Sequence, residues 1–549
     1  MDFVKNQIVT IKIEDIGTNG EGVGRVDGFT LFVKGAVIGD LVEAKIIKVK
    51  KHYGYARIEK ILEPGKDRVK PVCPVADKCG GCAIQHLSYE KQLEWKFQKV
   101  KNCLERIGGL ENIEQKMEPI YGMEYPYYYR NKAQFPVGTD KNGRLITGFY
   151  AGRTHSIIEN THCYIQAEVN EQILETVLGY CRRNHISAYD EKTGKGVLRH
   201  ILTRVGFRTG EIMVCLIINA NKKKMVKIEG LVEELTKIDG MTSITLNINR
   251  ERTNRILGDK IVPVWGQTYI TDYIGNVQYQ ISPLSFYQVN PKQTEVLYGK
   301  ALEYADLSGE ETVWDLYCGI GTISLFLAQK AKKVYGVEIV PQAIEDARQN
   351  AKINHLDNVE FFVGKAEEVL PREYEKHGIY ADVIVVDPPR KGCDGTLLDT
   401  IVAMAPKRVV YVSCDPATLA RDVKILGEKG YQVDKVSVVD QFGHSVHVET
   451  VVLLSQQKPD DTIEIDLDLD ELDATSAELK ATYQEIKDYV LKEFGLKVSS
   501  LYISQVKRKC GIEVGENYNL PRSVNTRVPQ CSKEKEDAIR SALKYFAMI

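Results

Sequence analysis

Hydrophobic and polar positions alternate along the first 60 residues. The segments "IVTIKIEDI", "EGVGRVDGFTLFV" and "LVEAKIIKVKKHYGYARIEKIL" place apolar residues at nearly every second position, and glycines and a Gly-Asp pair separate them. A period of two predicts β-strands with one buried face. Several short strands at this spacing, broken by turn residues, predict a small closed barrel.

The pattern changes twice further along the chain. Residues 96–285 mix helical and strand patterns, as in "KQLEWKFQKVKNCLERI" and "GEIMVCLIINA". From about 286 to 455, apolar strands such as "TVWDLYC" and "ADVIVVDPP" alternate with helices, which predicts a parallel sheet covered on both faces. An acidic segment near 456–474 then leads to the helical pattern "TSAELKATYQEIKDYVLKEF".

Length and composition set the broad class. A chain of 549 residues suggests three or four domains. The patterns place them at 1–62, 63–285, 286–455 and 456–549. No apolar run is long enough to cross a membrane, and the N-terminus lacks the features of a signal peptide. We therefore expect a cytoplasmic protein whose twelve cysteines do not form a disulfide framework.

Charge is unevenly distributed, although the net charge is only −2. Residues 44–60 contain six Lys or Arg and one acid, with tyrosines between them, whereas 460–473 contain eight acids and no base. A basic strip with interleaved aromatic residues suits a polyanion such as RNA. An ordinary solvated face remains the alternative.

The segment "VWDLYCGIGTISLFLA" (313–328) predicts a strand, a Gly-x-Gly loop and a helix that together bind a cofactor. Glu338 lies 19 residues after Gly319, where an acid binds ribose hydroxyls. The loop lacks the third glycine of the dinucleotide fingerprint, which serves close packing around a pyrophosphate site. The pattern therefore favours S-adenosylmethionine over NAD, without excluding NAD.

Two more segments point to the same edge of the predicted sheet. Asp387 ends a buried strand in "VIVVDPPRKG", and the two prolines that follow make a rigid turn. Asn290 and Pro291 predict the start of a helix, just after Gln288. An exposed loop amide is the alternative interpretation of Gln288.

The stretch "YVSCDPATLARD" (411–422) places Cys414 at the end of a buried strand. If the substrate is a uracil ring, a thiolate that adds to C6 makes C5 a nucleophile for a methyl group, and a base must then remove the C5 proton. Glu449, before an apolar run, is the candidate base. Asp415-Pro416 predicts a helix start, whose N-terminus favours a thiolate. A filler role for Cys414, and Cys393 as a rival nucleophile, stay open.

A cysteine cluster lies near the front of the chain. Cys73, Cys79 and Cys82 have the spacing C-x5-C-x2-C, and Cys163 is a fourth candidate. Closely spaced thiols with glycines in a cytoplasmic protein are typical metal ligands. The spacing does not separate zinc from an iron–sulfur cluster.

Taken together, the cysteine cluster and the motifs "DLYCGIGT", "GVE", "DPPRKG", "SCDPATLARD" and "HVETV" resemble the RNA uracil-5-methyltransferase family. The resemblance covers about residues 5–455 and is strongest to bacterial 23S ribosomal RNA (uracil-5-)-methyltransferases with an iron–sulfur cluster. Residues 1–60 resemble the TRAM module, an OB-like RNA-binding β-barrel.

The resemblance implies an α/β fold: a Rossmann-like class I methyltransferase domain, the TRAM barrel, an α+β central domain carrying the cluster, and a helical C-terminal extension. It implies Cys414 as nucleophile, in preference to Cys393, and Glu449 as base. The implied contacts to S-adenosylmethionine are Gln288, Tyr317, Gly319, Thr322, Glu338 and Asp387. Thr322 is the weakest, because some members have asparagine there. The implied ligands of a 4Fe-4S cluster are Cys73, Cys79, Cys82 and Cys163.

The expected partner is 23S ribosomal RNA, with no membrane and no obligate protein partner. Residues 125–138 resemble the family's substrate-facing segment. Transfer-RNA uracil methylation and a non-catalytic RNA-binding protein are the alternatives. Adenine amino-group methylation is less favoured, because it usually places an aromatic residue after the prolines, where Arg390 stands.

The tail, 456–549, is absent from short family members; we interpret it as a nucleic-acid accessory or as an element that packs against the catalytic domain.

Overall fold

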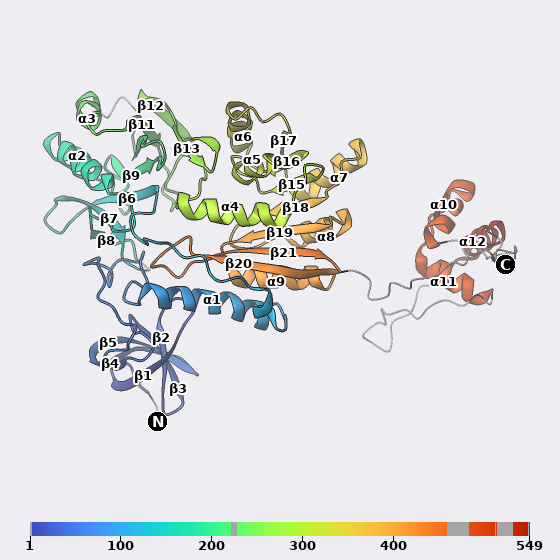
Figure 1. Cartoon of the computed structure of the whole chain (residues 1–549), viewed down its shortest axis with the longest axis horizontal. Helices are drawn as coiled ribbons and strands as arrows, with labels where there is room; N and C mark the ends of the chain where they lie inside the picture. The colour runs from blue at the N-terminus through green and yellow to red at the C-terminus, as the bar shows by residue number, and fades with distance from the viewer. Residues whose placement is uncertain are drawn as a thin grey trace. The chain divides into compact units, whose positions relative to one another are not determined.

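The computed structural model describes residues 3–152, 154–220, 228–457, 482–510, 512, 531–546 and 548. Its chain divides into two compact units, 1–458 and 459–549. The first unit contains a closed barrel, two seven-stranded sheets and a two-stranded hairpin (Figure 1).

The N-terminal strands close into a barrel in the order β1-β2-β3-β5-β4, which confirms the predicted barrel. Their bounds are Ile8–Ile16, Gly22–Val26, Phe29–Lys34, Leu41–Val49 and Tyr53–Glu63 for β1 to β5. Alternate residues such as Ile11, Leu31 and Ile46 are fully buried and form the barrel core. On β4 and β5, the lysines and the arginine alternate with buried residues and lie on the outside of the barrel. The predicted basic strip is therefore on the barrel surface.

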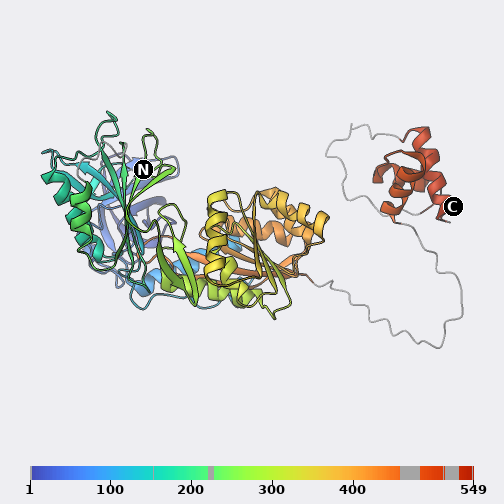
Figure 2. The same ribbon diagram turned by 90° about the horizontal axis from the view of Figure 1, so that it is seen from above.

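The central part forms a sheet in the order β12-β11-β10-β9-β6-β7-β8. The strand bounds are Lys132–Thr139, Leu145–Tyr150, Ile157–Glu159, Leu198–Val205, Ile212–Ile218, Met241–Ile248 and Lys260–Gly266 for β6 to β12. Helices α2 (Val169–Arg183) and α3 (Ile228–Leu235) pack on one face. The hairpin β13 (Ile270–Ile274) and β14 (Val277–Ile281) lies between this sheet and the next one (Figure 2).

The second sheet has the order β17-β16-β15-β18-β19-β21-β20. Its strand bounds are Thr312–Leu316, Lys333–Glu338, Val359–Val363, Val383–Val386, Arg408–Ser413, Tyr431–Val439 and Glu449–Gln456 for β15 to β21. The helix bounds are Pro291–Ala305, Thr322–Ala328, Pro341–Ile353, Ala366–His377, Gly395–Met404 and Pro416–Gly427 for α4 to α9.

These helices cover both faces of the second sheet, as predicted. Helices α4, α5 and α6 bury one core with the β13–β14 hairpin, and α7, α8 and α9 bury another on the opposite face. Helix α1 (Tyr89–Arg106) packs on α9, and the short 3-10 helix Ile113–Lys116 follows it. The strand order reverses between β15 and β18, which places the carboxyl ends of these strands beside a crevice where ligands bind in such sheets.

The prediction of a wholly parallel second sheet was wrong at its edge. Strand β21 runs antiparallel to β19 and to β20, between which it lies. Only residues 440–448 join β20 to β21, and such a short connection cannot hold the crossover helix that parallel neighbours need. This loop, called loop 440–448 below, therefore returns the chain to the edge of the sheet where β19 ends.

The second unit contains three described helices, α10 (Tyr483–Phe494), α11 (Ser500–Lys509) and α12 (Lys533–Tyr545). They bury a small core of their own, including Ile486, Ile503 and Ile539. The acidic segment 460–473 lies outside the described residues. No described helix is long and apolar enough to cross a membrane.

Candidate active site

A cavity of about 870 Å³ opens at the carboxyl ends of the parallel strands β15 to β19. Its walls come from the loops that follow these strands, from the segment before α4, and from loop 440–448 with the start of β21. All eight residues predicted from the sequence as catalytic or cofactor-binding line it: Gln288, Tyr317, Gly319, Thr322, Glu338, Asp387, Cys414 and Glu449.

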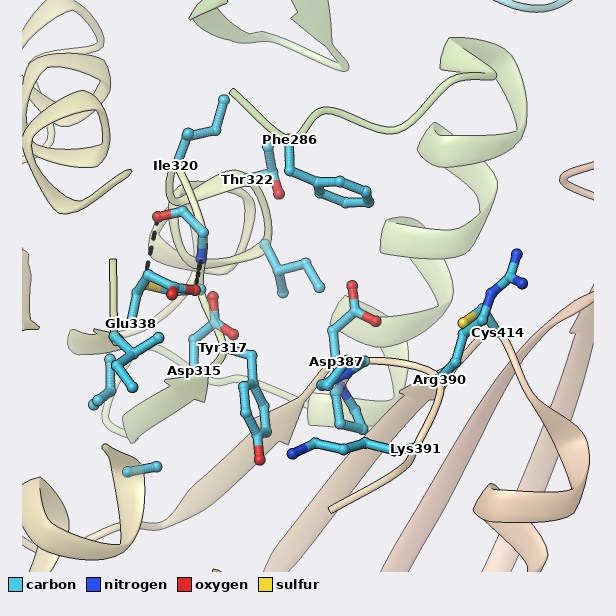
Figure 3. Close-up of a pocket in the computed structure, with 18 of the residues that line it drawn as sticks. Phe286, Asp315, Tyr317, Ile320, Thr322, Glu338, Asp387, Arg390, Lys391 and Cys414 are labelled. Carbon is cyan, nitrogen blue, oxygen red and sulfur yellow. Dashed lines mark hydrogen bonds between the residues drawn. The ribbon is translucent and has the colours of Figure 1, made fainter. Parts of the chain in front are cut away.

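The Gly-x-Gly loop forms one end of the cavity (Figure 3). The Glu338 carboxylate accepts hydrogen bonds from the N–H of Gly319 at 3.3 Å and of Val340 at 3.0 Å. Gly321 has a φ of +81°, and an added Cβ would lie 3.1 Å from Phe361. Only glycine suits this position, so the loop can bring its backbone close to a ligand.

Asp315, which sequence reasoning missed, lies in the wall next to this loop. It is fully buried, and Ser324 donates a hydrogen bond to its Oδ2 at 2.5 Å. Among the residues that the structure describes, its Oδ1 has no hydrogen-bond partner. Burial, with the nearby Asp387 and Glu338 carboxylates, raises the pKa of Asp315 to about 7. Such an acceptor suits a cationic group of a ligand.

The predicted helix start before α4 is confirmed. Asn290 caps the helix by accepting from the N–H of Gln293, and Pro291 is its first residue. Gln288 is 6% exposed; its backbone oxygen accepts from the Asn131 side chain at 3.0 Å. The hydroxyl of Thr322 already contacts that of Tyr298, at 3.1 Å.

Asp387 and Cys414 lie in the other part of the cavity, beside Arg390 (Figure 3). Asp387 follows β18, and its burial raises the pKa of its carboxyl to about 7. Cys414 follows β19, and Asp415 begins α9 as its N-cap, as predicted. Glu449, the first residue of β21, is 2% exposed, and burial followed by the charge of Asp387 raises its pKa well above the ordinary value.

The sequence indicated that the N-terminus of α9 favours a thiolate at Cys414, but burial of the thiol opposes this effect. Burial raises the pKa of Cys414 to about 11, and the charges of Glu449 and Asp387 add to this, against a lowering by Arg390. Asp415 Oδ1 accepts from the first free amides of α9, those of Ala417 and Thr418. The N-terminus of the helix is thus already satisfied by a carboxylate, and it does not offset the burial of the thiol.

The two other thiols in this region are placed differently. Cys393 is packed in the core beneath α8 and α9; its N–H donates to Asp422, and it is not among the residues that line the cavity. Cys318 lines the cavity but is 4% exposed, and burial raises its pKa well above the ordinary value. Of the cavity's thiols, Cys414 is the more accessible.

A first prediction concerns the ionisation of Cys414. Because its pKa is about 11, the thiolate fraction should rise about tenfold per pH unit between pH 7 and 9. The rate of alkylation by iodoacetamide at Cys414, followed by peptide mass spectrometry, should rise in the same way. A rate independent of pH in this range would show that the thiol is already ionised.

The four candidate cluster ligands lie within electrostatic range of one another. The pKa of Cys163 is raised to about 11, chiefly by burial, with contributions from Cys79 and Cys73, and the pKa of Cys82 is raised by burial and by the other three. In the described ranges, however, no three or more His, Cys, Asp or Glu side chains are close enough to hold a single metal ion.

Comparison with known proteins identifies the family. The family model "tRNA (Uracil-5-)-methyltransferase" matches residues 88–457, and the TRAM domain model matches residues 3–58. The chain belongs to the RNA uracil-5-methyltransferase family. It is therefore a methyltransferase that depends on S-adenosylmethionine and acts on RNA.

Relatives of this uracil-5-methyltransferase agree over the first unit. An uncharacterized RNA methyltransferase of Clostridium tetani is 52% identical over 452 residues, or 82% of this chain and 97% of the relative. One from Bacillus cereus is 51% identical over 453 residues, with the same coverage. The Pyrococcus abyssi tRNA (uracil-54, C5)-methyltransferase, solved with S-adenosyl-L-homocysteine, is 29% identical with a TM-score of 0.66; the match covers 81% of this chain and all of that one.

Proposed function

We propose that this enzyme transfers a methyl group from S-adenosylmethionine to C5 of a uridine in 23S ribosomal RNA, in the cytoplasm. The observation that carries the proposal is a single cavity that holds a half-buried thiol, Cys414, a buried carboxyl, Glu449, and the Gly-x-Gly loop. A thiol and a base side by side are what covalent activation of a pyrimidine needs.

The cavity fits S-adenosylmethionine. Its acids include Asp315, Glu338, Asp387 and Glu449, and the unpartnered Oδ1 of Asp315 suits an ammonium group. Gln288, Tyr317, Gly319 and Thr322 complete the set that would hold the cofactor. When bound, the cofactor supplies an electrophilic methyl group. The chain's own contribution is a set of carboxyl oxygens that accept hydrogen bonds from a cationic ligand, and the charge of that ligand would in turn favour the ionised forms of these acids.

The proposed reaction begins at Cys414. The thiol loses its proton to solvent, and Sγ forms a bond to C6 of the ring, which moves an electron pair toward C5. C5 would then form a carbon–carbon bond to the methyl group that the cofactor supplies, while the bond between that methyl group and the cofactor's sulfonium sulfur breaks and the sulfur leaves as a neutral thioether. The Glu449 carboxylate removes the C5 proton, the C5–C6 double bond returns, and the C6–S bond breaks to release the thiolate. Glu449 passes its proton to water, so that atoms and charge balance.

The mouth of the cavity suits an RNA strand. Arg390, Lys391 and Lys365 line it with exposed side chains, and Phe286, which also lines the cavity, is 66% exposed. These groups offer cations for phosphates and a ring for stacking. The target base must leave its stack, because a duplex hides C6 from the thiol.

The choice of ribosomal over transfer RNA rests on the TRAM barrel and the cysteine cluster. The Pyrococcus abyssi neighbour, which acts on tRNA, favours the alternative. We expect purified enzyme to transfer labelled methyl groups to 23S RNA, and to release one tritium from [5-³H]uridine for each methyl group. Methylation of tRNA alone would reverse the substrate assignment, and methylation without tritium release would exclude C5.

We also propose that Cys73, Cys79, Cys82 and Cys163 hold a 4Fe-4S cluster. Four mutually interacting cysteine thiols are the ligand set that a 4Fe-4S cluster uses. Protein purified without oxygen should contain about four iron atoms per chain, and Cys82→Ser should lose most of them. Cys103→Ser, on α1, is the control that should keep them; full iron content in Cys82→Ser would contradict the proposal.

A further inference from the structure

Loop 440–448 forms one wall of the cavity. Phe442 and His447 line the cavity together with Cys414, and the loop ends at Glu449. The two rings lie edge to face, with centroids 6.1 Å apart. Burial, followed by the charges of Arg390 and Lys99, lowers the pKa of His447 to about 4, so its imidazole is neutral at pH 7. An apolar ring beside a neutral imidazole suits an uncharged pyrimidine.

The loop is held in place by parts of the chain that lie more than 300 residues earlier. Lys96 Nζ donates to the carbonyl of Phe442 at 2.9 Å, and Lys99 Nζ donates to that of Val446 at 2.8 Å. Further donors reach the loop carbonyls between them. These are the Tyr129 hydroxyl, to Gly443 at 3.0 Å, and the Ile84 N–H, to His444 at 3.1 Å.

At the start of the loop, Asp440 makes the strongest of these contacts. Lys96 Nζ donates to Asp440 Oδ1 at 2.5 Å, and the Tyr89 hydroxyl donates to Oδ2 at 2.6 Å. Both charged side chains are 0% exposed. Burial lowers the pKa of Lys96, while Asp440 opposes this shift. Replacing a buried ion pair with apolar residues is often neutral or stabilising, so such a pair is weak evidence for stability.

We infer that Lys96 and Asp440 are positioning residues for the reaction: through loop 440–448 they fix Phe442 and His447 against the target base beside Cys414 and Glu449. The inference rests on the proposed function. Helix α1 supplies Lys96, Tyr89 and Lys99 from one face, and so fixes the loop from outside the methyltransferase sheet. The ion pair fixes the position of the loop, because Asp440 at the start of the loop must lie against Lys96 of helix α1.

The test separates position from stability. The double variant Lys96→Met/Asp440→Leu removes both charges and keeps the site apolar. It should fold, with a Tm close to or above that of the wild type, and bind S-adenosylmethionine within about twofold. Its kcat for RNA methylation should fall about 10- to 100-fold, because a misplacement of about 1 Å costs this much. A well-folded double variant with kcat within twofold of the wild type would overturn the inference.

Two further variants keep the result clear. Asp440→Asn retains the shape and one acceptor oxygen but leaves the buried charge of Lys96 without its partner, so its Tm should be lower than that of the double variant. Assayed below that Tm, its kcat per folded molecule should fall at least about fivefold; an unchanged kcat overturns the inference. Lys300→Met/Glu118→Gln removes another ion pair, of 2.9 Å, outside the loop, and should leave kcat unchanged. If the wild type methylates RNA but not at uracil C5, the proposed function fails, while the kcat comparison still tests the loop.

Discussion

Cys414→Ser is expected to lower the methylation rate by at least about 10³-fold, while S-adenosylmethionine binds within about twofold of the wild-type affinity. A serine hydroxyl fills the same space but is a far weaker nucleophile toward C6, so the ring carbon is not activated. Methyl incorporation into RNA and calorimetric titration of the cofactor measure the two effects separately.

The matched control for this change is Cys393→Ser. Cys393 lies on the loop between β18 and α8, which neighbours the loop of Cys414. Its side chain is buried in the core with α8 and α9 and does not line the cavity. We expect its substitution to cost stability and to leave the rate per folded molecule unchanged. If the serine variant at 414 methylated at the wild-type rate, or if only the 393 variant lost activity, the assignment of the nucleophile would be wrong.

Glu449→Gln is expected to stop the reaction after methyl transfer. Glutamine cannot accept the C5 proton, so C6 stays bonded to Cys414 and RNA remains attached to the protein. Turnover should fall by about 10²- to 10⁴-fold, the usual contribution of a general base. With unmodified RNA and S-adenosylmethionine, a stable protein–RNA band should appear on a denaturing gel, and it should contain the methyl label.

Glu428→Gln provides the comparison for Glu449→Gln, because Glu428 is an exposed acid at the end of α9. It should turn over normally and leave no attached RNA. Two results would count against Glu449 as the base: normal turnover of the variant, or loss of turnover with no methylated protein–RNA complex.

Local patterns allowed most of the fold and the cavity to be predicted. The barrel follows from strict alternation, and the starts of α4 and α9 follow from the Asn290-Pro291 and Asp415-Pro416 pairs. Six of the eight predicted residues meet in one cavity because parallel strands bring their carboxyl ends to one edge. Gln288 reaches this cavity from the segment before α4, and Glu449 reaches it as the first residue of the antiparallel strand β21.

What the sequence did not reveal depends on distant contacts. Asp315 stands inside an apolar strand, and its unpartnered oxygen becomes apparent only when the neighbouring side chains are in place. The raised pKa of Cys414 depends on Glu449, 35 residues away, and on Asp387. The pairing of Lys96 with Asp440 joins positions 344 residues apart, and no local pattern predicts it.

The most direct test of the central claim is to locate the bond between enzyme and RNA. RNA containing 5-fluorouracil, incubated with enzyme and S-adenosylmethionine, should form a stable adduct, because fluorine replaces the proton that Glu449 removes. After nuclease and trypsin digestion, mass spectrometry should find the methylated fluoronucleotide on Cys414, in the peptide 409–421. A nucleotide on another cysteine, or bound RNA with no adduct, would contradict the proposed mechanism.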